Sequence, residues 1–139
     1  MTRAAVASCV GLDVMAGVGV TDAKCFAAAI VDDDSAVLDS LRFLLEVAGH
    51  RVATYPSAAA FLADGNLRTC CLILDHHMPQ MTGLELVARL RAEGKPTRIM
   101  LITGSSSPAI RARAAELGVA KVVEKPPAED ELLDFVAAA

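Results

Sequence analysis

Apolar residues along the chain gather in short segments that alternate with longer stretches, in which apolar positions recur every three or four residues. Short apolar segments are typical of strands covered on both faces, whereas recurrence every three or four residues is typical of helices. The segments with a strand pattern are 26–31, 51–54, 70–74, 99–102 and 121–123. Those with a helical pattern are 35–48, 57–63, 83–92, 108–117 and 129–137.

This alternation predicts the α/β class, with a parallel sheet and helices on both of its faces. Right-handed crossovers then limit the topology. We expect Ser35 to cap the helix that follows the first strand and Gly49 to end it. In sheets of this kind, functional groups collect at the carboxyl ends of the strands, so those ends are the place to look for chemistry.

Charged and polar residues stand at the ends of four strands. Carboxylates within about 4 Å of each other repel by roughly 4 kcal/mol per pair at an effective dielectric constant near 20, so several of them together need a cation. Mg²⁺ prefers such oxygen ligands, an ammonium or hydroxyl group suits phosphate oxygens, and an aspartate can act as a nucleophile. These parts together fit phosphoryl transfer to a carboxylate. The residues concerned are Asp32, Asp33, Asp34, Asp75, Thr103, Gly104, Glu124, Lys125 and Pro126.

Composition narrows the class of protein. A chain of 139 residues with 54% apolar residues suits one domain with its own core. The net charge of −4 argues against a nucleic-acid-binding face, and no apolar run approaches the length that spans a membrane. The four cysteines, Cys9, Cys25, Cys70 and Cys71, form no C-x-x-C pair, and we interpret them as small apolar residues of a reduced, cytoplasmic protein.

The first 25 residues differ from the rest. They are rich in Ala, Gly and Val, and Asp13 interrupts the apolar stretch that a secretory signal requires. We therefore interpret residues 1–25 as a loosely ordered leader and residues 26–139 as the domain.

Five short motifs follow one another along residues 26–137. They are Ile30-Val31-Asp32-Asp33-Asp34, Leu74-Asp75-His76-His77-Met78-Pro79, Met81-Thr82-Gly83-Leu84-Glu85-Leu86, Ile102-Thr103-Gly104 and Glu124-Lys125-Pro126. In this order and spacing they resemble the receiver domain of two-component response regulators, and the last two variants most resemble its FixJ-like branch. The resemblance implies the CheY-like, flavodoxin-like fold: a doubly wound five-stranded parallel sheet of order 2-1-3-4-5 with five helices.

The resemblance also implies a role for each acidic residue of the motifs. Asp75 is the phospho-acceptor and a metal ligand. Asp33 binds Mg²⁺ (or Mn²⁺) directly, Asp32 binds it mostly through water, and the backbone carbonyl of His77 is a further ligand. Asp34 matches no required ligand, and we interpret it as a helix-capping or solvated residue.

Further residues of the motifs are expected to sense the phosphoryl group. The resemblance implies that Thr103 bonds a phosphoryl oxygen and moves with it, and that Lys125 pairs with phosphate and acceptor through a segment whose Lys-Pro bond is often cis. The family's dephosphorylation rate depends on side chains at the positions of His77 and Ser105. Val122 departs from the family pattern, because a Tyr or Phe that swings inward with the threonine usually stands there.

The resemblance implies a signalling switch rather than an enzyme with other substrates. Such a domain takes a phosphoryl group from a histidine kinase or histidine phosphotransfer protein and catalyses only its own phosphorylation and dephosphorylation. The chain ends soon after Lys125-Pro126, so we expect a stand-alone domain whose output is a protein contact or onward phosphotransfer. The family uses the face formed by 108–117, 121–123 and 129–137 for such contacts or for dimerisation, so a monomer or a phosphorylation-dependent homodimer is expected.

An alternative is a haloacid-dehalogenase-like phosphohydrolase. Asp32 and Asp34 match the D-x-D of its first motif. However, Ala36 stands where that motif has Thr or Val, no acidic pair follows Lys125, and Asp75 has no role in such an enzyme. Replacing Asp75 by Asn distinguishes the two, because only the receiver would lose labelling by acetyl phosphate.

Two further alternatives concern single residues. Val122 is the reason to consider a pseudo-receiver, an interaction domain whose acceptor site is intact but unused. His76 and His77 suggest a transition-metal site, but neighbouring side chains diverge and no other Cys or His stands at a ligand spacing.

Overall fold

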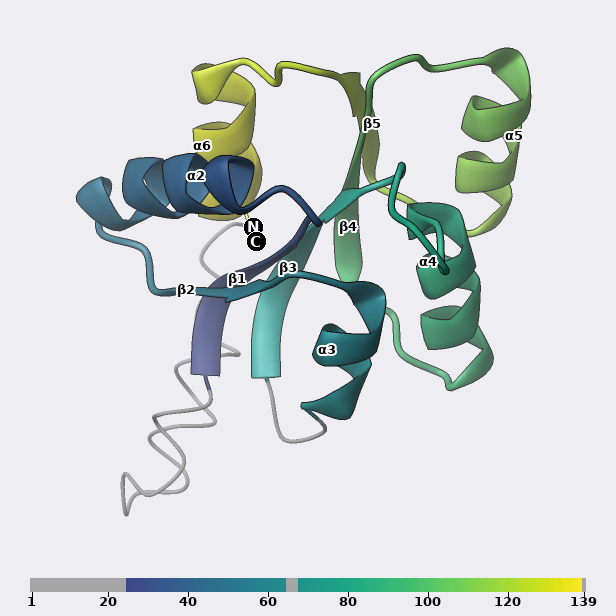
Figure 1. Cartoon of the computed structure of the whole chain (residues 1–139), viewed down its shortest axis with the longest axis horizontal. Helices are drawn as coiled ribbons and strands as arrows, with labels where there is room; N and C mark the ends of the chain where they lie inside the picture. Colours follow the sequence, from purple (N-terminus) through teal and green to yellow (C-terminus); the bar gives the residue numbers. More distant parts are fainter. Residues whose placement is uncertain (1–24, 65–67, 139) are drawn as a thin grey trace.

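The fold is a five-stranded parallel sheet with helices on both faces, seen here in a computed structural model that describes residues 25–64 and 68–138 (Figure 1). The strand order is β2-β1-β3-β4-β5, which confirms the predicted fold class and topology. The strands are β1 (Cys25–Val31), β2 (Val52–Tyr55), β3 (Arg68–Asp75), β4 (Arg98–Thr103) and β5 (Lys121–Glu124). The helices are α2 (Ser35–Val47), α3 (Ala58–Ala63), α4 (Gly83–Ala92), α5 (Pro108–Glu116) and α6 (Glu129–Ala137).

Element bounds differ little from those that the apolar pattern predicts. Strand β3 extends beyond the apolar segment 70–74 at both ends, because its backbone pairing continues from Arg68 with β1 to Asp75 with β4. The expected leader, residues 1–25, lies outside the described residues except for Cys25, where β1 begins, so its boundary stays a prediction. No helix in the described ranges is long and apolar enough to cross a membrane.

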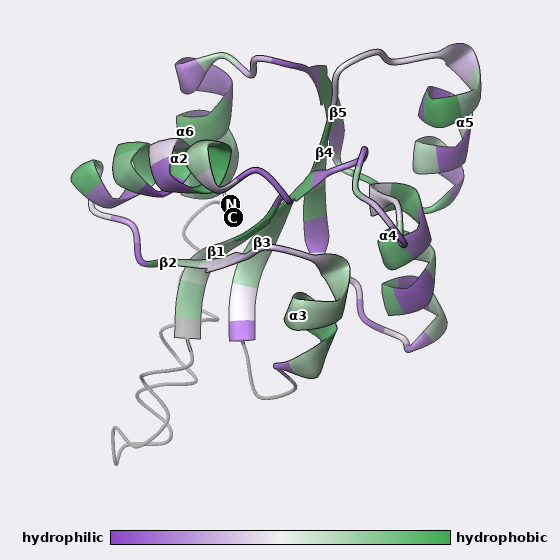
Figure 2. Ribbon diagram, viewed as in Figure 1, coloured by the Kyte–Doolittle hydropathy of each residue, from purple (hydrophilic) through white to green (hydrophobic). Residues whose placement is uncertain are grey.

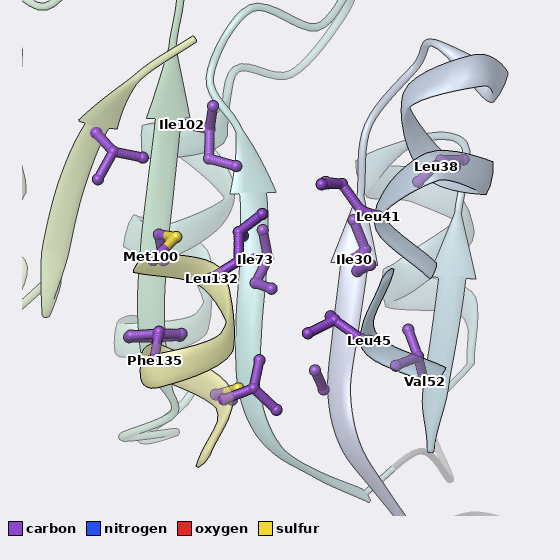
Figure 3. Packing of buried hydrophobic residues seen from close by; sticks show 14 residues of the cluster. Ile30, Leu38, Leu41, Leu45, Val52, Ile73, Met100, Ile102, Leu132 and Phe135 are labelled. Atoms are coloured by element: carbon purple, nitrogen blue, oxygen red, sulfur yellow. The ribbon is translucent and has the colours of Figure 1, made fainter. Parts of the chain in front are cut away.

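Helices α2 and α6 cover one face of the sheet (Figure 1). Their apolar side chains pack on every second residue of the central strands, as alternation of side chains along a strand requires. Figure 3 shows this layer, with Leu41 and Leu45 of α2 near Ile30, and Leu132 and Phe135 of α6 beside Met100. Burial of these side chains stabilises the fold by about 25 cal/mol for each Å² of apolar surface removed from water.

Helices α3, α4 and α5 cover the other face. Among these three helices, α4 contributes most of the buried side chains, whereas Ala114 is the buried residue of α5. The central strands are therefore apolar on both faces, and Figure 2 shows them as hydrophobic, with a hydrophilic segment between β1 and α2. Helix α5 buries fewer side chains than α4, so it is held less firmly against the sheet than α4 is.

The start of α2 differs from the prediction by one residue. Asp34 is the N-cap, and its side chain accepts hydrogen bonds from the backbone N–H groups of Ala36 and Val37. The prediction that Ser35 caps the helix is wrong, because Asp34 has the extended backbone of a cap and Ser35 is already helical. The interpretation of Asp34 as a helix-capping residue is confirmed, and Gly49, with φ of 96°, follows the end of the helix as expected.

Strand register brings the ends of the central strands to one edge. Val31 of β1 pairs with Leu74 of β3, so the residues that follow them, Asp32 and Asp75, are neighbours. Asp75 pairs with Ile102 of β4, and Thr103 then pairs with Glu124 of β5. The polar residues at the strand ends are therefore adjacent because of the parallel register alone.

Candidate functional site

Three carboxylates meet at the carboxyl edge of the sheet. Asp32 follows β1 and Asp75 ends β3, and both are buried, with 3% and 2% of their surfaces exposed. Asp33 is exposed beside them. Carboxylate oxygens of the three residues all lie within 4.8 Å of one another. We call Asp32, Asp33 and Asp75 the carboxylate cluster; the sequence predicted that these three residues meet.

Lys125 reaches the carboxylate cluster from the end of β5. Its Nζ lies 2.9 Å from Oδ1 of Asp75 and 3.9 Å from Oδ2 of Asp32. Burial alone would lower the pKa of Lys125, but the bond to Asp75 and the charges of Asp32 and Asp33 outweigh burial, so its pKa is raised. Lys125 is therefore protonated at neutral pH. The bond from Lys125 to the following proline is cis, as expected.

Burial dominates the electrostatics of Asp32. Loss of solvent raises the pKa of this carboxyl group, and the charges of Asp75 and Asp33 raise it further. The backbone N–H of Asp34, which donates to Oδ1 of Asp32 at 2.9 Å, and the charge of Lys125 act in the opposite direction. The net pKa of Asp32 is raised because burial and the two neighbouring carboxylates together outweigh the hydrogen bond and Lys125.

The carboxylate cluster fits a divalent cation that prefers oxygen ligands. Apart from the ion pair with Lys125, neither buried carboxylate oxygen of Asp75 has a hydrogen-bond partner among the described residues. Buried oxygens without donors are costly, so this geometry suits a group that supplies positive charge from outside the chain. Carboxylate oxygens are the ligands that Mg²⁺ and Mn²⁺ favour. The expected contribution of the His77 carbonyl stays a prediction.

The hydroxyl group of Thr103 is engaged by two loops. Thr103 is fully buried at the end of β4, and its hydroxyl donates to the Ser105 carbonyl and accepts from the Ser105 N–H, both at 3.2 Å. Nε2 of His77 lies 2.9 Å from the same Thr103 oxygen. Three of the residues expected to sense or modulate the phosphoryl group, Thr103, His77 and Ser105, therefore form one hydrogen-bonded cluster. No pattern in the sequence signals the His77–Thr103 contact, because it joins a residue of the loop after β3 to the end of another strand.

The start of α4 lies against the backbone of the acceptor residue. A Cβ atom on Gly83 would stand 2.7 Å from the Asp75 carbonyl oxygen and 2.9 Å from Cα of His76. Only glycine permits this approach, and the Gly83 N–H donates to the His76 carbonyl at 3.0 Å. The sequence motif contains Gly83, but its role in holding α4 against the site follows only from the structure.

A second polar network links the loop after β4 with the end of β5. Ser106 donates to Oε2 of Glu124 through its hydroxyl at 2.8 Å and its N–H at 3.3 Å. Arg111 of α5 donates to the Ser106 hydroxyl at 3.2 Å. These hydrogen bonds from Ser106 lower the pKa of Glu124. This network was not predicted, and it ties the first turn of α5 to β5.

Val122 stands where the resemblance implies that the family usually has an aromatic residue. It is half-buried and packs against the apolar cluster beneath α4 and α5. Its role as a modulating residue stays a prediction. The short side chain of Val122 does not reach as far as a Tyr or Phe ring would. Among the described residues, the hydrogen bonds around Thr103 and Ser106 connect the site with α5.

An apolar groove borders the site between α2 and α6. Its volume is about 390 Å³, and Asp32 and Lys125 line it together with residues of both helices. The helix residues and the prolines along it are Ala36, Val37, Ser40, Leu41, Leu44, Pro126, Pro127, Glu129 and Leu132. We call it the α2–α6 groove. On the same helix α2, the side chains of Phe43 and Val47 are both 70% exposed.

Histidines do not form a metal site in the described part of the chain. The carboxylate cluster is the group of potential ligands found there, and neither His76 nor His77 belongs to it. Instead, Nδ1 of His76 accepts a long hydrogen bond of 3.4 Å from the Leu84 N–H, and the two imidazole rings meet edge to face. The alternative of a histidine-bound transition metal therefore has no support in residues 25–64 and 68–138.

Comparison with known proteins identifies the class. Residues 28–137 match the family model of the response regulator receiver domain. The chain is 37% identical to the transcriptional regulatory protein FixJ of Bradyrhizobium diazoefficiens over 79% of its own length and 54% of that protein. It is 39% identical to the response regulator protein TodT of Pseudomonas putida over 79% of its length and 49% of that protein. The crystal structure of FixJ-N superposes with a TM-score of 0.70 at 32% identity, covering 79% of this chain and 91% of that one.

The chain belongs to the response regulator receiver domain family. This confirms the resemblance drawn from the motifs and leaves no support for the haloacid-dehalogenase-like alternative. As a receiver domain, it has a part in phosphorylation-dependent signalling. The chain spans about half the length of the curated relatives FixJ and TodT, 54% and 49% respectively.

Proposed function

We propose that this receiver domain is a switch that accepts a phosphoryl group on Asp75 from a histidine kinase or a histidine phosphotransfer protein. The observation that carries the proposal is the state of the Asp75 carboxylate. It is 2% exposed, it is paired with Lys125 at 2.9 Å, and its oxygens lie within 4.8 Å of those of Asp32 and Asp33. These surroundings suit a carboxylate that takes part in a reaction rather than one with a purely structural role.

The chemistry assigned to Asp75 is nucleophilic. One of its carboxylate oxygens attacks the phosphorus of a phosphohistidine, the P–N bond breaks, and the electron pair of that bond remains on the donor imidazole. The product is an acyl phosphate on Asp75. Water later attacks phosphorus, releases inorganic phosphate and restores the carboxylate. No residue other than those of the domain is needed for this second step.

Charge control comes from the residues around the acceptor. Bound Mg²⁺ or Mn²⁺, held by Asp32, Asp33 and Asp75, supplies positive charge that offsets the carboxylates and the phosphoryl oxygens. Lys125 keeps its proton and stabilises the charge on Asp75 before transfer and on the phosphoryl group afterwards. Thr103 provides a hydroxyl donor for a phosphoryl oxygen.

The α2–α6 groove is the proposed seat of the phosphodonor protein. It opens beside Asp32 and Lys125, and its apolar lining from Ala36, Val37 and Leu44 is suited to a helix that presents a histidine to the site. A protein donor would therefore depend on this groove, whereas a small donor such as acetyl phosphate would not.

Output is proposed to run through α5, β5 and α6. Phosphorylation changes the hydrogen bonds of Thr103, and the loop after β4 connects this residue through Ser106 to Glu124 and Arg111. The resulting contact is with a downstream protein or with a second copy of the domain. The net charge of −4 supports a protein rather than a nucleic acid as the partner of this domain, and we propose a cytoplasmic location.

A pseudo-receiver is the second candidate, and Val122 is the observation that favours it. With a small residue at this place, the domain would keep its acceptor but lack a response in α5. Binding of Mg²⁺ and beryllofluoride without any change in α5 amide signals would support the pseudo-receiver.

The experiment that tests the proposed function is phosphotransfer profiling. Purified histidine kinases, labelled on histidine with radioactive phosphate, are mixed with this protein and Mg²⁺, and transfer to Asp75 is followed in the wild type and in Asp75→Asn. Transfer from at least one kinase to the wild type alone is expected. No transfer from any kinase, and none from acetyl phosphate, would contradict the proposal.

A further inference from the structure

The hydrogen bond between His77 and Thr103 is not explained by phosphoryl transfer itself. Nε2 of His77 lies 2.9 Å from Oγ1 of Thr103, although 26 residues separate them in the chain. His77 lies in the loop that follows the acceptor Asp75, the last residue of β3, and Thr103 ends β4. The bond therefore joins the segment that receives phosphate to the residue that senses it.

Counting donors and acceptors defines the direction of this bond. A threonine hydroxyl has one hydrogen to donate and two lone pairs to accept with. The hydrogen of Thr103 goes to the Ser105 carbonyl and one lone pair accepts the Ser105 N–H, each at 3.2 Å. The remaining lone pair faces Nε2 of His77, so the network assigns the proton of that imidazole to Nε2. All three hydrogen-bonding positions of the Thr103 hydroxyl are then filled.

A filled hydroxyl has a consequence for the switch. To donate to a phosphoryl oxygen on Asp75, Thr103 must withdraw its single hydrogen from the Ser105 carbonyl. Rotation of the buried side chain to another staggered position turns the oxygen away from its present partners, including His77. In the structure the Thr103 hydroxyl makes no hydrogen bond to Asp75, whose described partner is Lys125.

We infer that His77 is a positioning residue that retains the Thr103 hydroxyl in the resting arrangement, and that phosphorylation of Asp75 breaks the His77–Thr103 hydrogen bond. The inference rests on the proposed function, because it takes Thr103 as the group that binds the phosphoryl oxygen. The imidazole thereby sets how readily the resting domain changes to the phosphorylated arrangement. It does so from the segment next to the acceptor, and it does not involve an aromatic residue at the position of Val122.

The test measures the affinity for beryllofluoride, a phosphoryl mimic, at saturating Mg²⁺ for each variant. His77→Ala removes the competing bond, so beryllofluoride should bind about two- to tenfold more tightly than to the wild type, the range expected for one net hydrogen bond. His77→Gln is the matched variant, because its side-chain amide can donate to Thr103, and its affinity should lie closer to the wild type. In a Thr103→Val background, His77→Ala should change nothing. Nuclear magnetic resonance should also show the Nε2 signal of His77 shifting when beryllofluoride binds.

The outcomes separate this inference from the proposed function. If the wild type binds no beryllofluoride in the presence of Mg²⁺, the proposed function fails and the inference fails with it. If the wild type binds but His77→Ala binds equally or more weakly, the inference alone is overturned. The same holds if the effect of His77→Ala persists without the Thr103 hydroxyl, or if the Nε2 signal of His77 does not move.

Discussion

Nζ of Lys125 lies 2.9 Å from Oδ1 of Asp75, so the last strand of the sheet holds the counterion for a carboxylate buried at the end of the central one. Asp75 is 2% exposed, whereas about a third of the Lys125 side chain, 34%, is exposed. The exposed part of the lysine leaves it accessible to the phosphoryl group that the proposed function places on Asp75. In the proposed function, this pair makes the reactivity of Asp75 depend on the residue that follows β5.

Replacing Lys125 by Met should lower the stability of the metal-free protein. The change leaves the charge of Asp75 buried without its counterion. Removing one partner of a fully buried pair costs about 3–5 kcal/mol. Because Lys125 is partly exposed and screened by solvent, we expect a loss of about 1–2 kcal/mol in the free energy of unfolding, measured with urea. Lys95→Met, which removes an exposed pair with Glu93, is the control and should have little effect. Equal losses in both variants would show that the Lys125–Asp75 pair contributes no more to the free energy of unfolding than an exposed ion pair does.

Addition of Mg²⁺ should stabilise the wild type. A cation bound to the folded protein alone raises the free energy of unfolding by RT ln(1 + [L]/Kd), about 1.4 kcal/mol at ten times Kd. Asp33→Asn removes one charge of the carboxylate cluster and should weaken the effect strongly. Thermal unfolding of both proteins over a range of Mg²⁺ concentrations measures this. A stabilisation that is the same in Asp33→Asn would place the cation elsewhere.

Replacing Gly83 by Ala should disturb both fold and site. The new Cβ would meet the Asp75 carbonyl oxygen and a methyl group of Leu101, both at 2.7 Å, so α4 must shift. We expect a loss of about 2–3 kcal/mol in the free energy of unfolding, as for other overpacked positions, and a lower Mg²⁺ affinity. Gly104→Ala is the control, because a Cβ there would have no neighbour within 4 Å. If Gly83→Ala behaves like Gly104→Ala in urea unfolding and Mg²⁺ titration, the close approach of α4 to Asp75 is not needed.

Replacing Ser40 by Arg should block the protein phosphodonor but not the small one. Ser40 lines the α2–α6 groove and is itself exposed, so the longer side chain fills the groove without disturbing the core. We expect transfer from the cognate kinase to slow by at least about tenfold, the effect of about 1.4 kcal/mol, with labelling by acetyl phosphate unchanged. Ala59→Arg, on α3 at the opposite face of the sheet, should leave both rates unaltered. Equal rates of transfer from the kinase to the two variants would show that the phosphodonor does not dock in the α2–α6 groove.

The buried thiol of Cys71 should make stability fall at high pH. Burial raises the pKa of Cys71 from 9.0 to about 12, so the folded state holds its proton where the unfolded chain has lost it. The contribution is complete below about pH 9 and is lost as pH rises towards 12, by about 1.4 kcal/mol per pH unit. Comparing urea unfolding of the wild type with Cys71→Ala between pH 9 and pH 11 isolates this group. Parallel stability curves for the two proteins would contradict the assignment.

Much of the site could be predicted from sequence because a parallel sheet has a regular register. Once the five strands are recognised, the residues at the carboxyl ends of β1, β3, β4 and β5 must share one edge, and Asp32, Asp75, Thr103 and Lys125 stand there. The error at the start of α2 has a local cause. Asp34 and Ser35 are both good caps, and only the backbone geometry distinguishes them.

The remaining features depend on side-chain positions that no periodicity encodes. The contact of His77 with Thr103 follows from the path of the loop after β3, in which Gln80 has a positive φ of 73°. The link from Arg111 through Ser106 to Glu124 likewise requires a particular placement of the loop after β4 between α5 and the end of β5. The sequence indicated the missing aromatic residue at Val122 but could not indicate which contacts connect the site with α5 in its absence.

The most direct test of the central claim is the intact mass of the protein after incubation with acetyl phosphate. With Mg²⁺ present, the wild type should gain the mass of one phosphoryl group, lose it again over time, and gain nothing when EDTA removes the metal. Asp75→Asn should gain nothing under any of these conditions. An equal mass gain in Asp75→Asn, or no gain in the wild type with Mg²⁺, would contradict the assignment of Asp75 as the phospho-acceptor.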